Sequence, residues 1–184
     1  MNAYDFDKTI YNGDSTFHFF KFILKKHPHL IPSFLVKSGY NFILYRLKKI
    51  TKTKMKEQFY SIFTKIDAEA LLCEFWDTHE KNIKKFYMEN QRDDDLIISA
   101  SPEFLLAPIC KRLGITHLIA SRVDVKTGKY TGENCWGEEK VVRFKEVYGD
   151  AEVGEFYSDS YSDTPMARLA RTAYLVKGDK LLDF

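Results

Sequence analysis

The stretch YDFDKTIYNGDS, residues 4–15, is the part of the sequence from which the fold can be worked out. Its alternating, aromatic start predicts a short buried strand over residues 2–6 that ends at acidic residues. Two carboxylates, Asp5 and Asp7, stand on alternate positions there. Alone, such a pair is more typical of a turn or a helix cap than of a functional site. Its meaning therefore depends on what the rest of the chain places beside it.

The composition is that of a globular protein. The chain has 184 residues, of which 45% are hydrophobic and 29% charged, enough for one full core and a small accessory domain. Its three cysteines are widely spaced, which excludes a disulfide framework and a Cys-x-x-Cys zinc site. A reducing, cytoplasmic setting fits best. Because Asp5 and Asp7 fall where an export signal needs an apolar run, we expect no cleavable signal.

A long helical block follows the first strand. Asp14 and Ser15 form a helix N-cap signal, and residues up to about 91 lack the alternation of strands. Pro28 and Pro32 are expected to separate the first helix from the next. Further helices are predicted over 33–49, 54–64 and 68–90, the last with Asp67 as its N-cap.

From residue 95 onward the pattern alternates between strand and helix. Strands are predicted at 96–99, 116–121, 153–158 and 173–176, with helices at 102–113 and 138–148 and a short one from Thr164. Gly114 is a helix C-cap signal, and residues 126–129 form a hairpin turn signal. This alternation predicts an α/β fold with a mainly parallel, Rossmann-like sheet. The catalytic core would comprise residues 1–14 and 92–184, with residues 15–91 inserted as an α-helical cap.

Polar residues that end the predicted strands are expected to meet at one edge of the sheet, where α/β proteins bind ligands. The set consists of oxygen ligands and one cation from the helix after the hairpin: Asp5, Asp7, Ser99, Asp159, Asp163 and Lys140. Oxygen-only ligands favour Mg²⁺ over zinc or copper, and Mg²⁺ commonly shares its coordination shell with a substrate phosphate. The set therefore suits a hard metal ion together with an anionic ligand.

These residues resemble the four motifs of the haloacid dehalogenase-like superfamily, whose phosphotransferases use an aspartate nucleophile. Residues 5–9, DFDKT, resemble its DxDxT motif, and Ser99 and Lys140 resemble the second and third motifs. Residues 159–163, DSYSD, resemble the acidic fourth motif. One DxD match would be weak, but four matches in order cover nearly the whole chain.

The position of the helical block, between the first and second motifs, resembles the subgroup that includes phosphoserine phosphatase. Three segments, SASP at 99–102, GENCWGEEK at 132–140 and YSDSYSD at 157–163, are more similar to phosphatidylglycerophosphatase C-like proteins. Ala100 and Ser101 follow the second-motif serine where two glycines are typical of the phosphoserine-specific pattern.

The resemblance implies a Mg²⁺-dependent phosphomonoester hydrolase that acts through an aspartyl-phosphate intermediate. Its substrate would be a small phosphate monoester or a phospholipid headgroup phosphate. Asp5 would be the nucleophile and Asp7 the general acid and base. The implied metal ligands are Asp5, Asp7 through its main-chain carbonyl, Asp159 and Asp163. The implied substrate-binding residues are Thr9, Ser99, Ala100 and Lys140, with Ser99 and Lys140 also counted as catalytic.

The same residues bear on three alternative functions. An EF-hand counted from Asp5 fails, because Ile10 and Thr16 stand where glycine and glutamate are required. Displacement at carbon, as in a dehalogenase, needs no general acid at Asp7. A non-catalytic or lipid- or nucleic-acid-binding protein on a phosphatase scaffold is the alternative of a different class, and its signature would be loss of Asp5 or Asp7.

The segment between Asp14 and Glu57 contains no acidic residue. Its cations are Lys21, Lys25, Lys26, Lys37, Arg46, Lys48, Lys49, Lys52, Lys54 and Lys56. Aromatic side chains are interleaved with them. An ordinary cap with solvated lysines, peripheral contact with an anionic membrane or lipid-like substrate, and nucleic-acid binding all fit this composition. Nucleic acid is not expected as a partner, since no nucleic-acid-binding module is recognisable.

Overall fold

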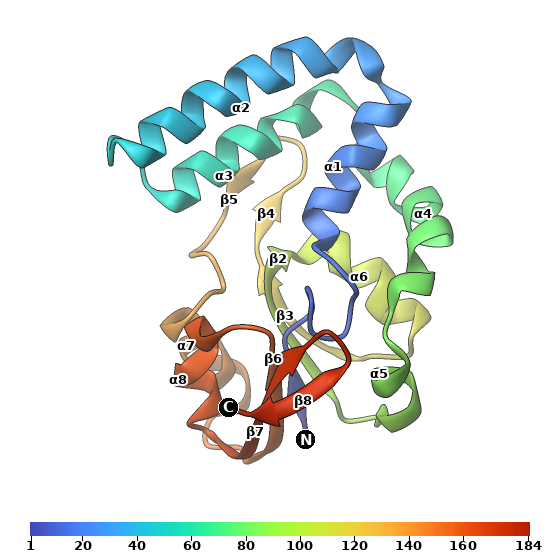
Figure 1. Cartoon of the computed structure of the whole chain (residues 1–184), viewed down its shortest axis with the longest axis vertical. Coiled ribbons are helices and arrows are strands. Elements are labelled where there is room, and N and C mark those ends of the chain that lie inside the picture. Colours follow the sequence, from blue (N-terminus) through green and yellow to red (C-terminus); the bar gives the residue numbers. More distant parts are fainter.

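A computed structural model describes residues 1–184 as a layered α/β body beneath a roof of helices (Figure 1). A six-stranded sheet has the order β3-β2-β1-β6-β7-β8, and all its pairs are parallel except β7 with β8. The strands are β1 (Ala3–Tyr4), β2 (Leu96–Pro102), β3 (His117–Ser121), β6 (Val153–Ser158), β7 (Ala170–Lys177) and β8 (Lys180–Asp183). The mainly parallel sheet predicted from the alternating pattern is confirmed.

Core clusters cover both faces of the central strands, and successive residues of each strand contribute to opposite sides. Ile97 belongs to a core cluster with residues of α6 (Glu103–Arg112) and α4 (Ala68–His79). Its neighbour Ile98 belongs to a second cluster with residues of α7 (Glu138–Tyr148) and α8 (Thr164–Ala167). Burial of each such side chain contributes about 1.5–3 kcal/mol. The result is a three-layer arrangement in which a ligand can reach the central strands only at their ends.

The helical insertion contains α1 (Ser15–Lys26), α2 (Ile31–Arg46), α3 (Lys52–Tyr60), α4 (Ala68–His79) and α5 (Lys85–Asn90). Short 3-10 turns lie at Pro28–Leu30, Ser61–Lys65 and Glu80–Asn82. Asp14 caps α1 by accepting a hydrogen bond from the Phe17 N–H, and Asp67 caps α4 by accepting one from the Ala70 N–H. Both predicted caps are confirmed. No helix combines the length and the apolar character required to span a membrane.

Two helix predictions were wrong in detail. The single helix expected over 68–90 is interrupted at residues 80–84, where the Lys84 N–H donates to the Ile10 carbonyl and Ile83 forms a bridge with Tyr11. These contacts draw the chain out of helical geometry. Pro32 does not separate helices but lies in the first turn of α2, where a missing N–H costs no hydrogen bond.

The insertion divides into a roof and a flank (Figure 1). Helices α1, α2 and α3 rise above the strand ends, whereas α4 and α5 run down beside the core. The indole N–H of Trp76 on α4 donates to the Leu105 carbonyl of α6 at 2.8 Å, which fastens the flank to the core. The part of the predicted cap that can cover a site is therefore its first half.

A hairpin of the core reaches up to the roof. It consists of β4 (Val123–Asp124) and β5 (Lys129–Tyr130), joined by the predicted turn. Gly128, at the tip, has φ of +69°, and a Cβ there would lie 2.6 Å from the backbone of Tyr60. Only glycine allows this close approach. The Tyr130 N–H also donates to the Glu57 carboxylate of α3 at 3.2 Å.

Several strands differ from the prediction, including β1, which spans only Ala3–Tyr4 of the expected residues 2–6. β2 continues to Pro102, so that Ser99 lies within it rather than at its end, and β7 begins at Ala170 instead of residue 173. β8 was not predicted, because its four residues are all exposed and carry no buried-strand alternation.

Candidate active site

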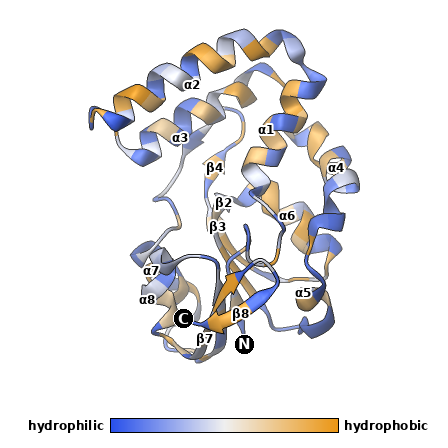
Figure 2. Cartoon of the chain, in the orientation of Figure 1, coloured by the Kyte–Doolittle hydropathy of each residue, from blue (hydrophilic) through white to orange (hydrophobic).

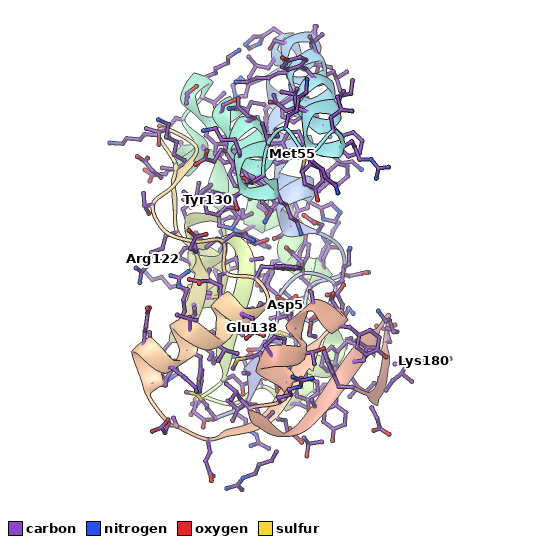
Figure 3. The ribbon with its side chains drawn as sticks, turned by 90° about the vertical axis from the view of Figure 1, so that its left-hand side faces the viewer. Asp5, Met55, Arg122, Tyr130, Glu138 and Lys180 are labelled. Atoms are coloured by element: carbon purple, nitrogen blue, oxygen red, sulfur yellow. The ribbon has the colours of Figure 1, made fainter.

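The carboxylates from separate strands converge where the strand order reverses. β1 and β6 are neighbours in the sheet, although most of the chain lies between them, and such a switch point is where α/β proteins bind ligands. Asp5 and Asp7 follow β1, whereas Asp159 and Asp163 follow β6. All four line a cavity of about 620 Å³ between the core and the roof. Figure 3 shows Asp5 below this space and Met55 of α3, which also lines it, above.

A buried lysine links two of these carboxylates. Lys140, in the first turn of α7, donates from Nζ to Asp5 Oδ1 and to Asp163 Oδ2, each at 2.7 Å. Its exposed fraction is 1%, and Ser158 also donates to Asp163 Oδ2 at 2.8 Å. Burial alone would lower the pKa of Lys140, but Asp5 and Asp163 raise it above its ordinary value. Lys140 is therefore a permanent cation at the base of the cavity.

Asp5 is held with its carboxylate against that cation. Its N–H donates to the Tyr157 carbonyl of β6 at 2.9 Å, which fixes the backbone at the end of β1. Burial raises the pKa of Asp5 to about 6, although the Lys140 ammonium lowers it. The pair brings a carboxylate and a fixed positive charge to the same point of the cavity.

Asp7 has neutral hydrogen-bond donors in place of a lysine. Asp7 Oδ1 accepts from the Ser15 N–H at 2.7 Å, and Asp7 Oδ2 accepts from the Ser101 hydroxyl. Burial raises the pKa of Asp7 to about 7, with a further contribution from the Asp14 carboxylate. A carboxyl group with a pKa near neutrality is suited to general acid and base catalysis.

A tight loop after β1 aims these two side chains. The N–H groups of Thr9, Ile10 and Tyr11 all donate to the Phe6 carbonyl, and Lys8 takes a left-handed conformation with φ of +59°. The loop turns Thr9 inward, where it is fully buried with no hydrogen-bond partner for its hydroxyl and does not line the cavity. The prediction that Thr9 contacts substrate therefore does not fit its position.

The second-motif segment contributes three consecutive residues to the cavity: Ser99, Ala100 and Ser101. The Ser99 hydroxyl accepts from the Ser101 N–H at 3.2 Å. Ser101, which binds Asp7, was missed by the sequence interpretation. The sequence did contain a pattern that could have identified Ser101, since residues 99 and 101 fall on the same face of an extended strand.

The roof supplies a different kind of surface. The residues of α1, α2 and α3 that line the cavity are Thr16, Phe17, Phe20, Phe34, Ser38, Lys52, Met55, Lys56, Phe59 and Tyr60. Most of these side chains are aromatic or apolar, and none is acidic. This wall can therefore hold an apolar group, and its lysines can meet a negative charge.

Lys56 is a roof residue that contacts the core, and it was also missed. Its Nζ donates to Asn134 Oδ1 at 3.0 Å and lies 3.4 Å from the Ala100 carbonyl oxygen. Burial lowers the pKa of Lys56 to about 8, and the nearby Lys52 ammonium lowers it further. Nothing in the local sequence distinguishes Lys56 from the other lysines of this basic segment.

The donor atoms available for a metal are all oxygens. Asp5, Asp159 and Asp163 offer carboxylates, and Asp163 Oδ1 is buried without a hydrogen-bond partner. No three His, Cys, Asp or Glu side chains are close enough together to hold a metal ion among themselves. Mg²⁺ usually takes one or two carboxylates and completes its shell with waters and substrate phosphate. The residues therefore fit a Mg²⁺ ion shared with substrate better than an all-protein cage.

A parallel α/β core with carboxylates and a buried lysine at its switch point defines a class of hydrolases. The chain belongs to the haloacid dehalogenase-like hydrolase family, whose model matches residues 3–168.

Individual relatives agree with this assignment. The chain is 25% identical to a histidinol-phosphatase of Neisseria meningitidis over 226 aligned positions, which cover 100% of this chain and 92% of that protein. It is 38% identical over 94 residues to a Mycobacterium tuberculosis protein named as a probable phosphatase, with 47% of this chain and 33% of that one covered. The chain thus matches about a third of that relative's length. A solved protein of unknown function from Bordetella pertussis superposes with a TM-score of 0.77, at 21% identity, over 94% of this chain and 87% of that one, and supports the fold.

Proposed function

We propose that this protein is a Mg²⁺-dependent phosphomonoester hydrolase that acts through an aspartyl-phosphate on Asp5. The observation that carries the proposal is the arrangement of Asp5, Asp7 and Lys140 in one cavity. One carboxylate is held against a permanent cation, and the other, two residues on, has a pKa of about 7. The phosphatase names of the Neisseria and Mycobacterium relatives support the same reaction class.

In the first step a carboxylate oxygen of Asp5 forms a bond to phosphorus while the ester P–O bond breaks. The leaving alkoxide needs a proton, and Asp7 supplies it from its protonated form. In the second step water attacks the phosphorus of the aspartyl-phosphate, Asp7 takes the proton from that water, and the bond between phosphorus and Asp5 breaks. This sequence divides one difficult hydrolysis into two easier displacements.

Positive charge and hydrogen-bond donors stabilise the phosphoryl group during both steps. Lys140 Nζ lies 2.7 Å from Asp5 Oδ1 and is therefore beside the attacked phosphorus when substrate is bound. Ser99 lines the same cavity and offers its hydroxyl to a phosphoryl oxygen. A Mg²⁺ ion held by Asp5, Asp159 and the Asp7 carbonyl, with Asp163 behind them, would neutralise the repulsion between carboxylate and phosphate.

The substrate in this proposal is a small phosphate monoester or the phosphate of a phospholipid headgroup. Aromatic side chains dominate the roof wall, and Lys56 is the cation that projects from it towards the core. Apolar contact with the leaving group, together with one charge contact at Lys56, is the recognition that such a wall provides.

The experiment is phosphate release from a panel of monoesters with and without Mg²⁺. The panel contains an aryl phosphate, phosphoserine, histidinol phosphate and phosphatidylglycerophosphate in detergent. We expect Mg²⁺-dependent release from at least one compound by the wild type. No release from any of them by folded protein with Mg²⁺ present would contradict the proposal.

A further inference from the structure

Helix α2 exposes a series of apolar side chains to solvent. The exposed fractions are 61% for Leu35, 75% for Val36, 63% for Tyr40, 52% for Phe42 and 57% for Ile43, and Leu47 follows with 59%. In Figures 1 and 2, α2 is the helix farthest from the sheet, and hydrophobic residues recur along it. A surface helix normally places its apolar stripe against the core and its polar residues outward.

The inward face of α2 is occupied by other residues. Phe34 and Ser38 line the cavity, and Asn41 is buried with its amide donating to the Lys37 carbonyl. At about 100° of rotation per residue, Val36, Tyr40, Ile43 and Leu47 lie on the opposite side of the helix. The exposed apolar face is thus a second stripe, and packing of the roof does not account for it. Contiguous exposed apolar surface of this kind marks a contact site.

The charge around this face is of one sign. Arg46, Lys48 and Lys49 are exposed at the end of α2, and no acidic residue occurs between Asp14 and Glu57. Two of the acidic side chains that follow this segment are already paired: Glu57 with Lys54 at 3.0 Å, and Glu74 with Lys26. A partner for this face must accept apolar side chains at its centre and carry negative charge at its rim.

We propose that the outer face of α2 docks on an anionic phospholipid bilayer and lies in its interfacial plane. Aromatic and aliphatic side chains flanked by lysine and arginine are the composition of helices that bind at this depth without spanning the membrane. A second copy of the chain fits less well, because pairing α2 with α2 would bring like charges together. This inference goes beyond the proposed hydrolase activity and does not depend on it.

The first test is co-sedimentation with vesicles of phosphatidylcholine alone and of phosphatidylcholine with phosphatidylglycerol. We expect binding to the anionic vesicles that weakens as salt rises and is at least about tenfold weaker on the neutral ones. Substitution of Val36→Ser together with Ile43→Ser should reduce the partition coefficient on anionic vesicles by about tenfold or more. The matched control, Val142→Ser with Val147→Ser, removes two exposed valines from α7 of the core and should bind like the wild type.

Measurements of activity and of oligomeric state distinguish membrane binding from an effect on the active site and from dimerisation. Neither Val36 nor Ile43 lines the cavity, so turnover of a soluble monoester should be unchanged in the pair variant. Failure of vesicle binding by the wild type would overturn the inference, and so would equal binding by the two variants. A concentration-dependent dimer in gel filtration that the α2 substitutions abolish would overturn it in favour of a second copy.

Discussion

The floor of the cavity, formed by residues of the α/β core, and the roof, formed by α1, α2 and α3, differ in how their charged side chains are paired. On the floor, Asp5, Lys140 and Asp163 are buried and joined by hydrogen bonds of 2.7 Å, so that the two carboxylates share one cation. The roof wall is mostly aromatic or apolar, and its two lysines, Lys52 and Lys56, have no carboxylate partner; burial lowers the pKa of Lys56. We infer from this comparison that the floor carries the proposed reaction and that the roof selects the molecule on which it acts. Each half can be changed separately.

Loss of the floor cation should have the largest effect. Lys140→Met leaves the buried Asp5 and Asp163 carboxylates uncompensated, which should lower the free energy of unfolding by about 3–5 kcal/mol and abolish turnover. Urea denaturation of metal-free protein measures the change. Lys145→Met, an exposed lysine on the same helix, should stay within about 0.5 kcal/mol of the wild type. Equal stabilities for the two variants would show that the floor is not held by this pair of contacts.

Replacement of Asp7, the other proposed catalytic carboxylate of the floor, should affect kcat more than the free energy of unfolding. Asp7→Asn should reduce kcat on an alkyl phosphate by about 10²- to 10⁴-fold, because the alkoxide then leaves without a proton. An aryl phosphate has a better leaving group, so rapid mixing should still show a burst of aryl alcohol before slow turnover.

The same substitution at a helix N-cap outside the cavity is the control for Asp7. Asp67→Asn keeps an effective N-cap on α4 and should change kcat little. If Asp7→Asn slows the first step equally on alkyl and aryl esters, Asp7 is not the proton donor.

A substitution at the tip of the β4–β5 hairpin, where the core contacts the roof, should have a smaller effect on stability and activity. Gly128→Ala places a methyl group 2.6 Å from the backbone of Tyr60, so the hairpin must retreat from α3. We expect a loss of about 1–3 kcal/mol in unfolding free energy and a raised KM. Gly114→Ala is the matched control, with φ of +73° but no atom near the added methyl, and should retain the wild-type KM. Equal KM values in both variants would remove the hairpin from substrate binding.

The smallest expected effect concerns Lys56 and depends on pH. Burial lowers its pKa to about 8, so its positive charge is present well below pH 8 and is lost as the pH rises through that value. For a substrate with an anionic leaving group, KM should rise above pH 8 while kcat changes little. Lys56→Met should raise KM by about tenfold at neutral pH and remove this pH dependence. Lys54→Met, an exposed lysine two residues earlier on α3, should behave like the wild type. If the KM of Lys56→Met still rises above pH 8, the group that titrates is not Lys56.

The floor could be predicted from the sequence because its geometry follows from topology. The ends of adjacent parallel strands must meet, so Asp5, Asp7, Asp159 and Asp163 were expected together, and the structure places all four on one cavity. Lys140 was expected at the start of a helix and lies in the first turn of α7. Local signals also located helix α7 and strand β6 at their observed bounds.

The remaining contacts could not be predicted because they depend on packing between distant segments. Lys56 meets Asn134, 78 residues away, and no local pattern fixes that encounter. Thr9 was assigned to substrate from its motif position, yet the hydrogen bonds of its loop turn it into the core. The interruption between α4 and α5 likewise arises from contacts with residues 10 and 11.

The most direct test of the central claim is phosphorylation of Asp5 itself. The protein would be mixed rapidly with an aryl phosphate and Mg²⁺, quenched in acid, and its peptides analysed by mass spectrometry, with Asp5→Asn as the comparison. We predict a phosphoryl group on the peptide that contains Asp5 in the wild type, released on further incubation, and none in Asp5→Asn. Phosphate release by the wild type without modification of that peptide, or undiminished turnover by Asp5→Asn, would contradict the account.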